Sequence, residues 1–421
     1  MLAEGPRFQY RDVDVTVAVV DVDATRMARA RSPSLEPAIA PKDACVRVEF
    51  AFPKVDPVLA RPSRAAWETG PRTKEEEFAR AVALGLHDYL RKSRSRGFVL
   101  SLSGGADSAA IACLISFMVS TGSSELGVPG LAHRLSHIEG LGGARTPRDL
   151  TRRLLTCVYQ ATRNSSETTR AAARRVAEGV GAEHLELDVD RLVQGYVGIV
   201  EAAIGRELSW DEDDVALQNI QARARAPSAW LLANVKGALL VATSNRSEAA
   251  VGYATMDGDT CGGLAPIAGV DKAFLREWLR WMEGEGPSGL GAFPFLSAVN
   301  AQQPTAELRP GNEQTDEADL MPYDVLNAIE QAVIRDKLSA VEAWQLVTAR
   351  FLQHGPGRVA EWVERFLRLW CRNQWKRERY APSFHLDDEN LDPKTWCRFP
   401  ILSGGFEREI ADLRAAAGRR G

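Results

Sequence analysis

The sequence predicts an α/β protein built on a doubly wound parallel sheet with helices on both faces. Four apolar runs have the length and composition of buried strands, at residues 98–102, 154–159, 184–187 and 237–243. Helical patterns such as residues 166–179 separate them, and strands that alternate with helices favour parallel pairing. Ligands bind at the carboxyl ends of the strands in such sheets, so functional residues are expected there.

Composition excludes several classes of protein. The chain of 421 residues is 45% hydrophobic, enough for a large core, and its net charge is only −4. That charge gives no bulk attraction to nucleic acid or to a membrane surface, and no apolar run approaches the roughly 20 residues that span a bilayer. We therefore expect a cytoplasmic enzyme with no nucleic-acid or membrane partner. The six cysteines are widely spaced, which favours reduced thiols over disulfides or a zinc site.

The first part of the chain predicts a short β remnant and a linker. Valines alternate through residues 8–23 in the manner of a strand that lacks its own domain. Residues 53–72 are rich in proline and polar side chains, and a helical pattern starts at Thr73. We expect a remnant over residues 1–52, a linker over 53–72 and a second domain over 73–421.

Three further stretches of the second domain carry structural predictions. The glycine-rich residues 122–143 are too long for a plain connector and predict a surface excursion or lid. Residues 284–304 are long enough to close over a reactive intermediate, although a disordered connector has a similar composition. The C-terminal third is mainly helical, and its aromatic stripe predicts a packed core. The stripe consists of Trp344, Phe351, Trp362, Phe366, Leu369 and Trp370.

The hexapeptide from Ser103 to Ser108 is the most specific signal in the chain. It lies between the first predicted strand and a helical pattern, so it predicts a tight glycine turn that ends at a helix N-terminus. Gly104 and Gly105 let the backbone approach a phosphate, and the unpaired amide groups of the helix favour its negative charge. Asp107 lies within this loop, where a carboxylate beside polyphosphate is suited to bind magnesium.

This loop is not the usual nucleotide loop, because no Lys followed by Ser or Thr comes after it. It resembles the loop of the ATP pyrophosphatases, which have the adenine nucleotide alpha hydrolase-like fold and split ATP between its α and β phosphates to adenylate a substrate. The fourth predicted strand ends shortly before Glu248. Beside the first strand, this end would bring Glu248 close to Asp107, and the two carboxylates would share one magnesium ion.

The residues around Glu248 resemble a particular family, the synthetase domain of the glutamine-dependent NAD synthetases. The resemblance covers roughly residues 75–405, and several spaced motifs in one order are more specific than any single motif. These motifs lie at residues 242–272, 302–310, 314–317, 321–326 and 383–388. Residues 8–14 resemble the tail of the nitrilase-type amidase domain of the same family, so we expect the chain to lack most of that domain.

The resemblance implies an ATP and magnesium site, residue by residue. The loop would hold pyrophosphate and magnesium through Ser103, Gly104, Gly105, Asp107 and Ser108. Glu248 would share the metal, and Thr243 would contact ATP. Lys272 and Thr305 would bind the β and γ phosphates and, with Asp107, form the catalytic set. A cation and a hydroxyl aimed at a leaving group stabilise it most as its bond breaks.

The second substrate implied by the resemblance is nicotinic acid adenine dinucleotide. Asp259 would recognise its nicotinate ring, and Arg223 would lie near the nucleotides, where a guanidinium pairs well with phosphate. The nicotinate carboxylate would be adenylated by ATP, and ammonia would then displace AMP to form NAD. The ammonia would be free or would come from a separate glutaminase subunit, and the family implies a homodimer.

Three alternatives stay open at this point. Another ATP pyrophosphatase-type amidotransferase would share the phosphate loop but is not expected to carry the motifs of Asp259 and Thr305. An inactive, truncated interaction subunit is disfavoured because Asp107, Glu248 and Lys272 are all present. A nitrilase-like amidase would need far more than the first 50 or so residues, a length well below that of a typical enzyme domain.

Overall fold

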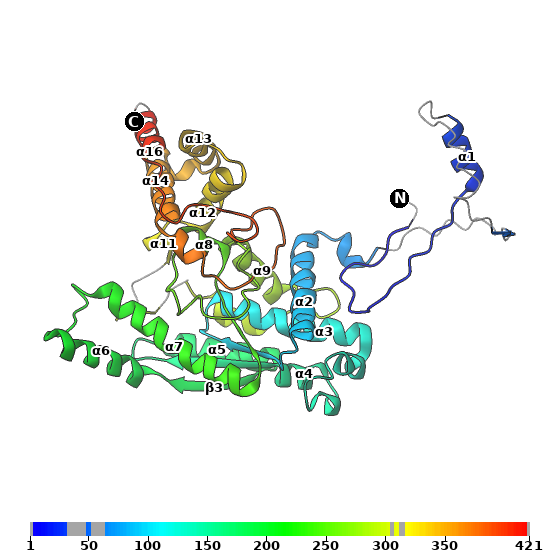
Figure 1. Cartoon of the computed structure of the whole chain (residues 1–421), viewed down its shortest axis with the longest axis horizontal. Helices are drawn as coiled ribbons and strands as arrows, with labels where there is room; N and C mark the ends of the chain where they lie inside the picture. Colours follow the sequence, from blue (N-terminus) through cyan, green and yellow to red (C-terminus); the bar gives the residue numbers. More distant parts are fainter. Residues whose placement is uncertain (1–2, 32–47, 52–63, 304–306, 311–315, 419–421) are drawn as a thin grey trace. The chain divides into compact units, whose positions relative to one another are not determined.

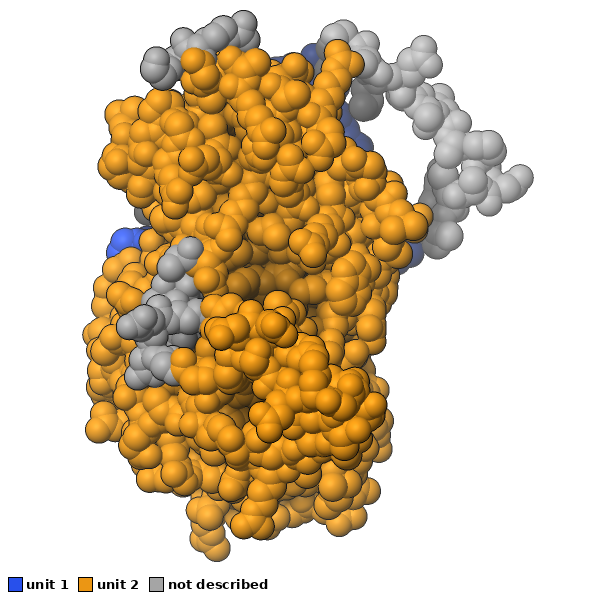
Figure 2. Space-filling view, turned by 90° about the vertical axis from the view of Figure 1, so that its left-hand side faces the viewer, with its two compact units in different colours: residues 1–71 blue, residues 72–421 orange. Residues whose placement is uncertain are grey.

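The computed structural model of the chain describes residues 3–31, 48–51, 64–303, 307–310 and 316–418. The chain divides into two compact units, Met1–Pro71 and Arg72–Gly421 (Figure 2). The boundary lies directly before the helix expected at Thr73. The assignment of the first unit to an amidase remnant and a linker stays a prediction.

The first unit contains a helix and no strand among its described residues. Its elements are α1 (Val22–Ala30) and η2 (Ala66–Glu68). The strand predicted over residues 8–23 is therefore wrong: no described residue pairs with this segment, and Val13, Val15 and Val17 are all more than 70% exposed. A period-two pattern of valines predicts a strand only where a neighbouring strand can take its backbone hydrogen bonds.

The second unit carries the sheet and most of the helices (Figure 1). The strands are β1 (Phe98–Ser101), β2 (Leu155–Ala161), β3 (Glu183–Asp188) and β4 (Leu239–Val241). The helices as far as the middle of the chain are α2 (Thr73–Ser93), α3 (Ala106–Arg134), η3 (Leu141–Gly143), α4 (Pro147–Leu154), α5 (Glu167–Val180), α6 (Asp190–Ile204), α7 (Asp214–Lys236) and α8 (Arg246–Val251). The remaining helices are α9 (Lys272–Gly284), η4 (Pro294–Leu296), α10 (Ser297–Asn300), α11 (Asp316–Asp319), α12 (Tyr323–Glu330), η5 (Gln331–Arg335), α13 (Ala340–Arg350), η6 (Leu352–His354), α14 (Pro356–Arg372), α15 (Gln374–Arg377) and α16 (Glu407–Gly418).

The four strands form one parallel sheet in the order β3-β2-β1-β4. In this register Phe98 pairs with Leu155 on one side and with Leu239 on the other. The prediction of a parallel sheet, and of a fourth strand beside the first, is confirmed. The carboxyl ends of β1 and β4 consequently lie side by side, which brings together the two loops that carry the predicted site residues.

Helices cover both faces of the sheet, as predicted. On one face, Ala229 and Ala233 of α7 pack against Val99, Val158 and Leu240. Their small side chains allow α7 to lie close to the strands. Side chains alternate along a strand, so the residues that flank Val99 point to the opposite face, where α3 and α5 pack along the sheet.

The C-terminal helices form a second core, and α12, α13, α14 and α16 gather at one end of the unit (Figure 1). Trp344, Phe366 and Trp370 are each at most 1% exposed. The interpretation of the aromatic stripe as packing is confirmed. Burial of such large side chains contributes about 2–3 kcal/mol each relative to leaving them exposed.

Residues 122–143 form no surface excursion, so that prediction is wrong. Most of them continue α3, which is interrupted only at Gly127, where φ is 73°. Leu131, Leu135 and Leu141 are buried and hold this stretch against the protein. By length and composition, α3 alone among the described helices could cross a membrane, but 61% of its most apolar stretch is buried inside the protein, as expected of a core helix.

Candidate functional site

The glycine turn after β1 forms a tight loop at the carboxyl edge of the sheet. Gly104 has a φ of 85°, and a Cβ atom there would lie 2.1 Å from the carbonyl oxygen of Thr169. Only glycine fits this position. The Oγ atoms of Ser103 and Ser108 lie 3.1 Å apart, and the amide groups of Ser103 and Gly105 donate to these hydroxyls. The two serines therefore hold the loop in shape, and Ser108 is only 2% exposed.

Helix α3 starts directly after this loop, and no side chain caps its N-terminus. Its first amide groups therefore keep their capacity to bind an anion, with the positive end of the helix dipole behind them. Ser103, Gly105 and Asp107 line a pocket that opens on one face of the second unit (Figure 2). Gly104 and Ser108 shape the loop behind that surface.

Two predicted carboxylates converge on one predicted lysine in this pocket. The Nζ atom of Lys272 contacts Asp107 and lies 3.3 Å from Oε1 of Glu248. Asp271 caps α9 and so places Lys272 at its first position, and Asn245 caps α8 and so places Glu248 in its first turn. The structure thus brings Lys272 together with Glu248, 24 positions earlier in the sequence, and with Asp107, 165 positions earlier.

Asn245 is a residue that sequence reasoning missed. Its Oδ1 atom accepts a hydrogen bond from the amide group of Glu248, and its Nδ2 atom donates to Oδ1 of Asp107 at 3.0 Å. One side chain therefore caps a helix and orients a carboxylate of the phosphate loop. Its place between Thr243 and Glu248 was a signal that could have identified it.

The donor set fits a magnesium ion. Asp107 and Glu248 supply hard oxygen ligands, and the ammonium group of Lys272 already shows that their geometry accommodates a cation between them. No cluster of three or more metal-ligating side chains occurs among the described residues. Phosphate and water oxygens would complete the coordination, as is usual for magnesium.

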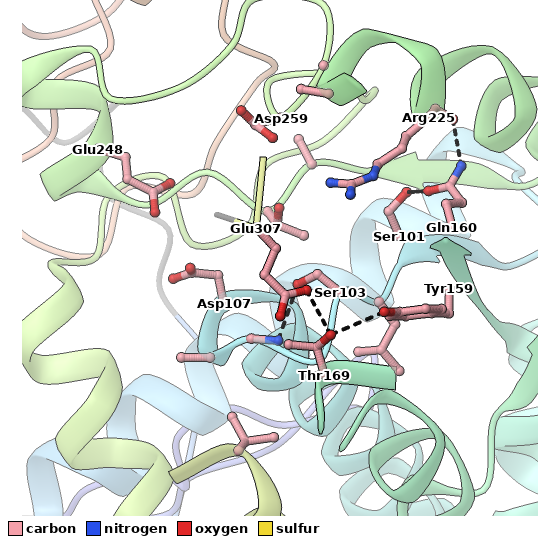
Figure 3. Close-up of a pocket in the computed structure, with 18 of the residues that line it drawn as sticks. Ser101, Ser103, Asp107, Tyr159, Gln160, Thr169, Arg225, Glu248, Asp259 and Glu307 are labelled. Carbon is pink, nitrogen blue, oxygen red and sulfur yellow. Dashed lines mark hydrogen bonds between the residues drawn. The ribbon is translucent and has the colours of Figure 1, made fainter. Parts of the chain in front are cut away.

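The opposite side of the pocket is formed by Arg225, Asp259 and the ends of β1 and β2 (Figure 3). Oγ of Ser101 donates to Gln160, and Nε2 of Gln160 donates to the carbonyl oxygen of Arg225 at 2.6 Å. Asp259 is exposed within the open pocket, and desolvation by the surrounding protein raises its pKa, although the amide group of Thr255 and the nearby Arg225 partly oppose this effect. Burial likewise lowers the pKa of Arg225.

The outcomes for the other predicted residues differ. Thr243 and Asp259 line the pocket. Arg223 does not: it is exposed, and its Nε donates to the carbonyl oxygen of Met256 at 3.0 Å. Thr305 lies outside the described residues. Of the segment 284–304, the described part ends in Gln302 and Gln303, which line the pocket, so it borders the site without showing closure.

Glu307 is a second residue that sequence reasoning missed. Its carboxylate accepts hydrogen bonds from Oγ1 of Thr169 at 2.9 Å and from the amide group of Ser166 at 3.4 Å, beside the phosphate loop. The dipole at the N-terminus of α5 stabilises this negative charge. Glu307 therefore attaches the chain that follows Thr305 to the wall of the pocket.

Comparisons with known proteins show the family of the chain. The sequence model of the NAD synthase family matches residues 78–364. The glutamine-dependent NAD(+) synthetase of Oryza sativa is 32% identical over 92% of this chain and 55% of its own length, and that of Homo sapiens is 30% identical over 94% and 58%. The chain thus spans little more than half the length of these relatives.

A solved structure shows the same fold. The crystal structure of a glutamine-dependent NAD(+) synthetase from Cytophaga hutchinsonii superposes with a TM-score of 0.70 and 46% identity, over 81% of this chain and 56% of that one. The matched family segment contains the phosphate loop, Glu248 and Lys272. This chain belongs to the NAD synthase family.

Proposed function

We propose that the chain catalyses the ATP-dependent amidation of nicotinic acid adenine dinucleotide to NAD, in the cytoplasm. The observation that carries this proposal is the meeting of Asp107, Glu248 and Lys272 beside an uncapped helix N-terminus. This arrangement suits a reaction in which pyrophosphate leaves, because an anion hole, a cation and two potential metal ligands face the same space.

The first step would be adenylation. An oxygen of the nicotinate carboxylate attacks the α phosphate of ATP, a new oxygen–phosphorus bond forms, and the bond between the α phosphorus and its bridging oxygen breaks. The amide groups of the loop and Lys272 would bind the departing pyrophosphate, which takes the electron pair. A magnesium ion held by Asp107 and Glu248 would neutralise part of its charge. Thr243 and Thr305 would contact ATP.

The second step would form the amide. Ammonia adds to the carbonyl carbon of the acyl adenylate, the bond from that carbon to the phosphate oxygen breaks, and AMP leaves as the nitrogen loses a proton. Asp259 would face the pyridine ring. The ammonia would be free or would come from a separate glutaminase subunit.

We further propose that the chain works as a homodimer through α6 and α7. These two helices pack against each other and expose apolar side chains at helical spacing. The exposed residues are Leu192, Tyr196, Ile199, Val200, Ile204, Leu231 and Val235. Arg223 would lie beside this interface, since it is two helical turns before Trp230, which is exposed on α7 next to Leu231. Sedimentation tests the proposal: the wild type is expected to run as a dimer and Leu231→Glu as a monomer.

The enzymatic proposal is tested with the purified chain, ATP, magnesium and nicotinic acid adenine dinucleotide. Ammonium should support formation of NAD, AMP and pyrophosphate, and EDTA should abolish it. Asp107→Asn should lower the rate by about 100- to 1,000-fold, because it removes a charge that acts on the leaving group. Asp412→Asn, an exposed site on α16, is the matched control and should change nothing.

Each other result has a clear meaning. Activity with glutamine in place of ammonium would show that the chain itself has glutaminase activity. A folded wild type that forms no NAD with either nitrogen source would contradict the proposal and favour another adenylating enzyme or an inactive subunit.

A further inference from the structure

Arg225 occupies the sheet-facing side of α7 at the point where the helix passes the ends of the strands. Ala229 and Ala233 on this side pack on the sheet, and Arg225 precedes Ala229 by one helical turn. Beyond the strand ends there is no sheet to pack on. The side chain therefore enters the pocket, and Figure 3 shows its guanidinium pointing into the open space between Asp259 and Ser103.

This guanidinium has no protein partner among the described residues. Its Nε atom is buried and donates to no protein acceptor, and no carboxylate of the described residues lies within ion-pair distance of the group. The carbonyl oxygen of Arg225 is, in contrast, firmly held by Gln160 and by Oγ of Ser228 at 2.9 Å. The backbone is thus fixed while the charged end is left unpaired.

Arg225 is half-buried, with its Nε atom shielded from solvent, and a charge partly withdrawn from water is costly unless it is paired. Burial lowers the pKa of Arg225, and Asp259, Tyr159 and Glu307, which lie beyond ion-pair distance, oppose this effect only in part. The protein without ligand therefore has an unfavourable charge in this site, and an anionic ligand would neutralise it. A planar guanidinium fits two oxygens of a carboxylate or a phosphate in particular.

The position of the group distinguishes between the anions of the reaction. Pyrophosphate would lie at the uncapped N-terminus of α3 with Lys272, which is already paired with Asp107 and Glu248. Arg225 faces the other side of the pocket, beside Asp259. The anion expected on that side is the carboxylate of the second substrate.

We propose that Arg225 binds the aromatic carboxylate of the dinucleotide substrate and so selects the acid over the amide. The inference rests on the proposed function. One carboxylate oxygen attacks the α phosphate while the guanidinium holds the other. In the second step that other oxygen gains negative charge as ammonia adds, and the same guanidinium stabilises it before AMP leaves. No proton transfer by Arg225 is required.

Binding measurements on the full chain test this assignment. Calorimetric titrations would use nicotinic acid adenine dinucleotide, NAD, ATP and AMP with the wild type, Arg225→Met, Arg225→Lys and the matched control Arg175→Gln, an exposed residue of α5. Arg225→Met should weaken binding of the acid dinucleotide by about 100-fold, as expected for loss of a buried charge pair. Its affinity for NAD, ATP and AMP should change less than about threefold, which is within the range of effects on indirect contacts. The affinity of Arg225→Lys for the acid dinucleotide should lie between those of the wild type and Arg225→Met, because lysine keeps the charge and loses the bidentate geometry.

Several outcomes would overturn the assignment. Equal losses for the acid dinucleotide and NAD would mean that Arg225 binds another part of the substrate, and a loss for ATP or AMP would assign it to a phosphate. Failure of both variants to fold would assign it a structural role. A wild type that binds neither dinucleotide would instead refute the proposed function, so the two failures are distinguishable.

Discussion

Arg225 is half-buried and Arg246 is fully buried in the second unit, and their surroundings are opposite. The guanidinium of Arg246 is ion-paired with Glu389 at 2.7 Å and lies 3.0 Å from Oε1 of Glu330, and it also donates to Asn327 and the carbonyl oxygen of Gly269. The Nε atom of each arginine lacks a hydrogen bond, but no carboxylate of the described residues lies within ion-pair distance of Arg225. Burial acts to lower the pKa of both groups, yet the carboxylates around Arg246 outweigh it and raise its pKa.

The difference separates a structural arginine from a binding one. Arg246 joins α8, which carries Glu248, to the start of α9, which carries Lys272, and to α12. It therefore acts on the site only by positioning other residues. Arg225 contributes nothing comparable to the fold and points its charge at the pocket. Whether carboxylates of the protein neutralise an arginine is thus a better guide to the role of that arginine than its burial or charge alone.

The largest effect is expected from Arg246→Met. Removing one member of a buried charge cluster leaves its carboxylates uncompensated, which costs about 3–5 kcal/mol of stability. Urea unfolding of the full chain at pH 7 measures this loss. Arg335→Met is the matched control, because Arg335 also pairs with Glu389 but is 37% exposed; its loss should stay below about 1 kcal/mol. Equal losses of stability for the two variants would refute the proposed difference between the buried Arg246 and the exposed Arg335.

A smaller effect for each pH unit is expected on the pH dependence of stability. Burial raises the pKa of Glu330 to about 8, although Arg246 opposes this shift. The folded chain then holds a proton that the unfolded chain has lost between about pH 4.5 and 8, so stability falls as the pH rises through this range. The slope is on the order of 1 kcal/mol per pH unit, because one pKa unit corresponds to about 1.4 kcal/mol.

Glu330→Gln should remove this fall, since an amide does not titrate. Urea unfolding at pH 5, 6, 7 and 8 gives the slope for each variant. Glu342→Gln serves as the control, because hydrogen bonds from Ser339 lower the pKa of this exposed carboxyl and its titration lies below the range. An unchanged slope in Glu330→Gln would mean that Glu330 is ionised in the folded protein.

The smallest effect is expected from Arg225→Met on stability. An apolar side chain of similar length removes an unpaired charge, so the stability should be unchanged or higher by up to about 1 kcal/mol. The same urea titration measures it. A loss close to that of Arg246→Met would show that Arg225 has a protein partner and would weaken the assignment of a ligand to it.

Much of the site could be predicted from local sequence. Gly104 and Asp107 occur in one short motif, and the requirement for glycine follows from backbone geometry that few residues share. The strands were found because apolar runs of that length are uncommon outside a sheet. The side-by-side placement of Glu248 and Asp107 followed from the rule that parallel strands present their carboxyl ends at one edge.

Local pattern failed where a partner far away in the chain decides the structure. The valines of residues 8–23 form no strand, since no described strand pairs with them. Residues 122–143 contain several glycines. The contacts of the buried Leu131 and Leu135 with the rest of the protein nevertheless keep most of this segment helical. Glu307 could not be assigned from its sequence position, because its partners Ser166 and Thr169 lie about 140 residues earlier.

The two arginines of α7 show most clearly which features follow from the sequence and which depend on the folded structure. The amino-acid sequence alone was enough to identify the family, the phosphate loop, the closeness of Asp107 and Glu248, and the presence of arginine on this helix. Successive residues of a helix are turned by about 100°, so Arg223 and Arg225 face nearly opposite directions. Only the packing of Ala229 and Ala233 on the sheet decided that Arg225 enters the pocket and Arg223 does not. Which face of a helix meets the sheet depends on contacts between distant segments, and these exist only in the folded chain.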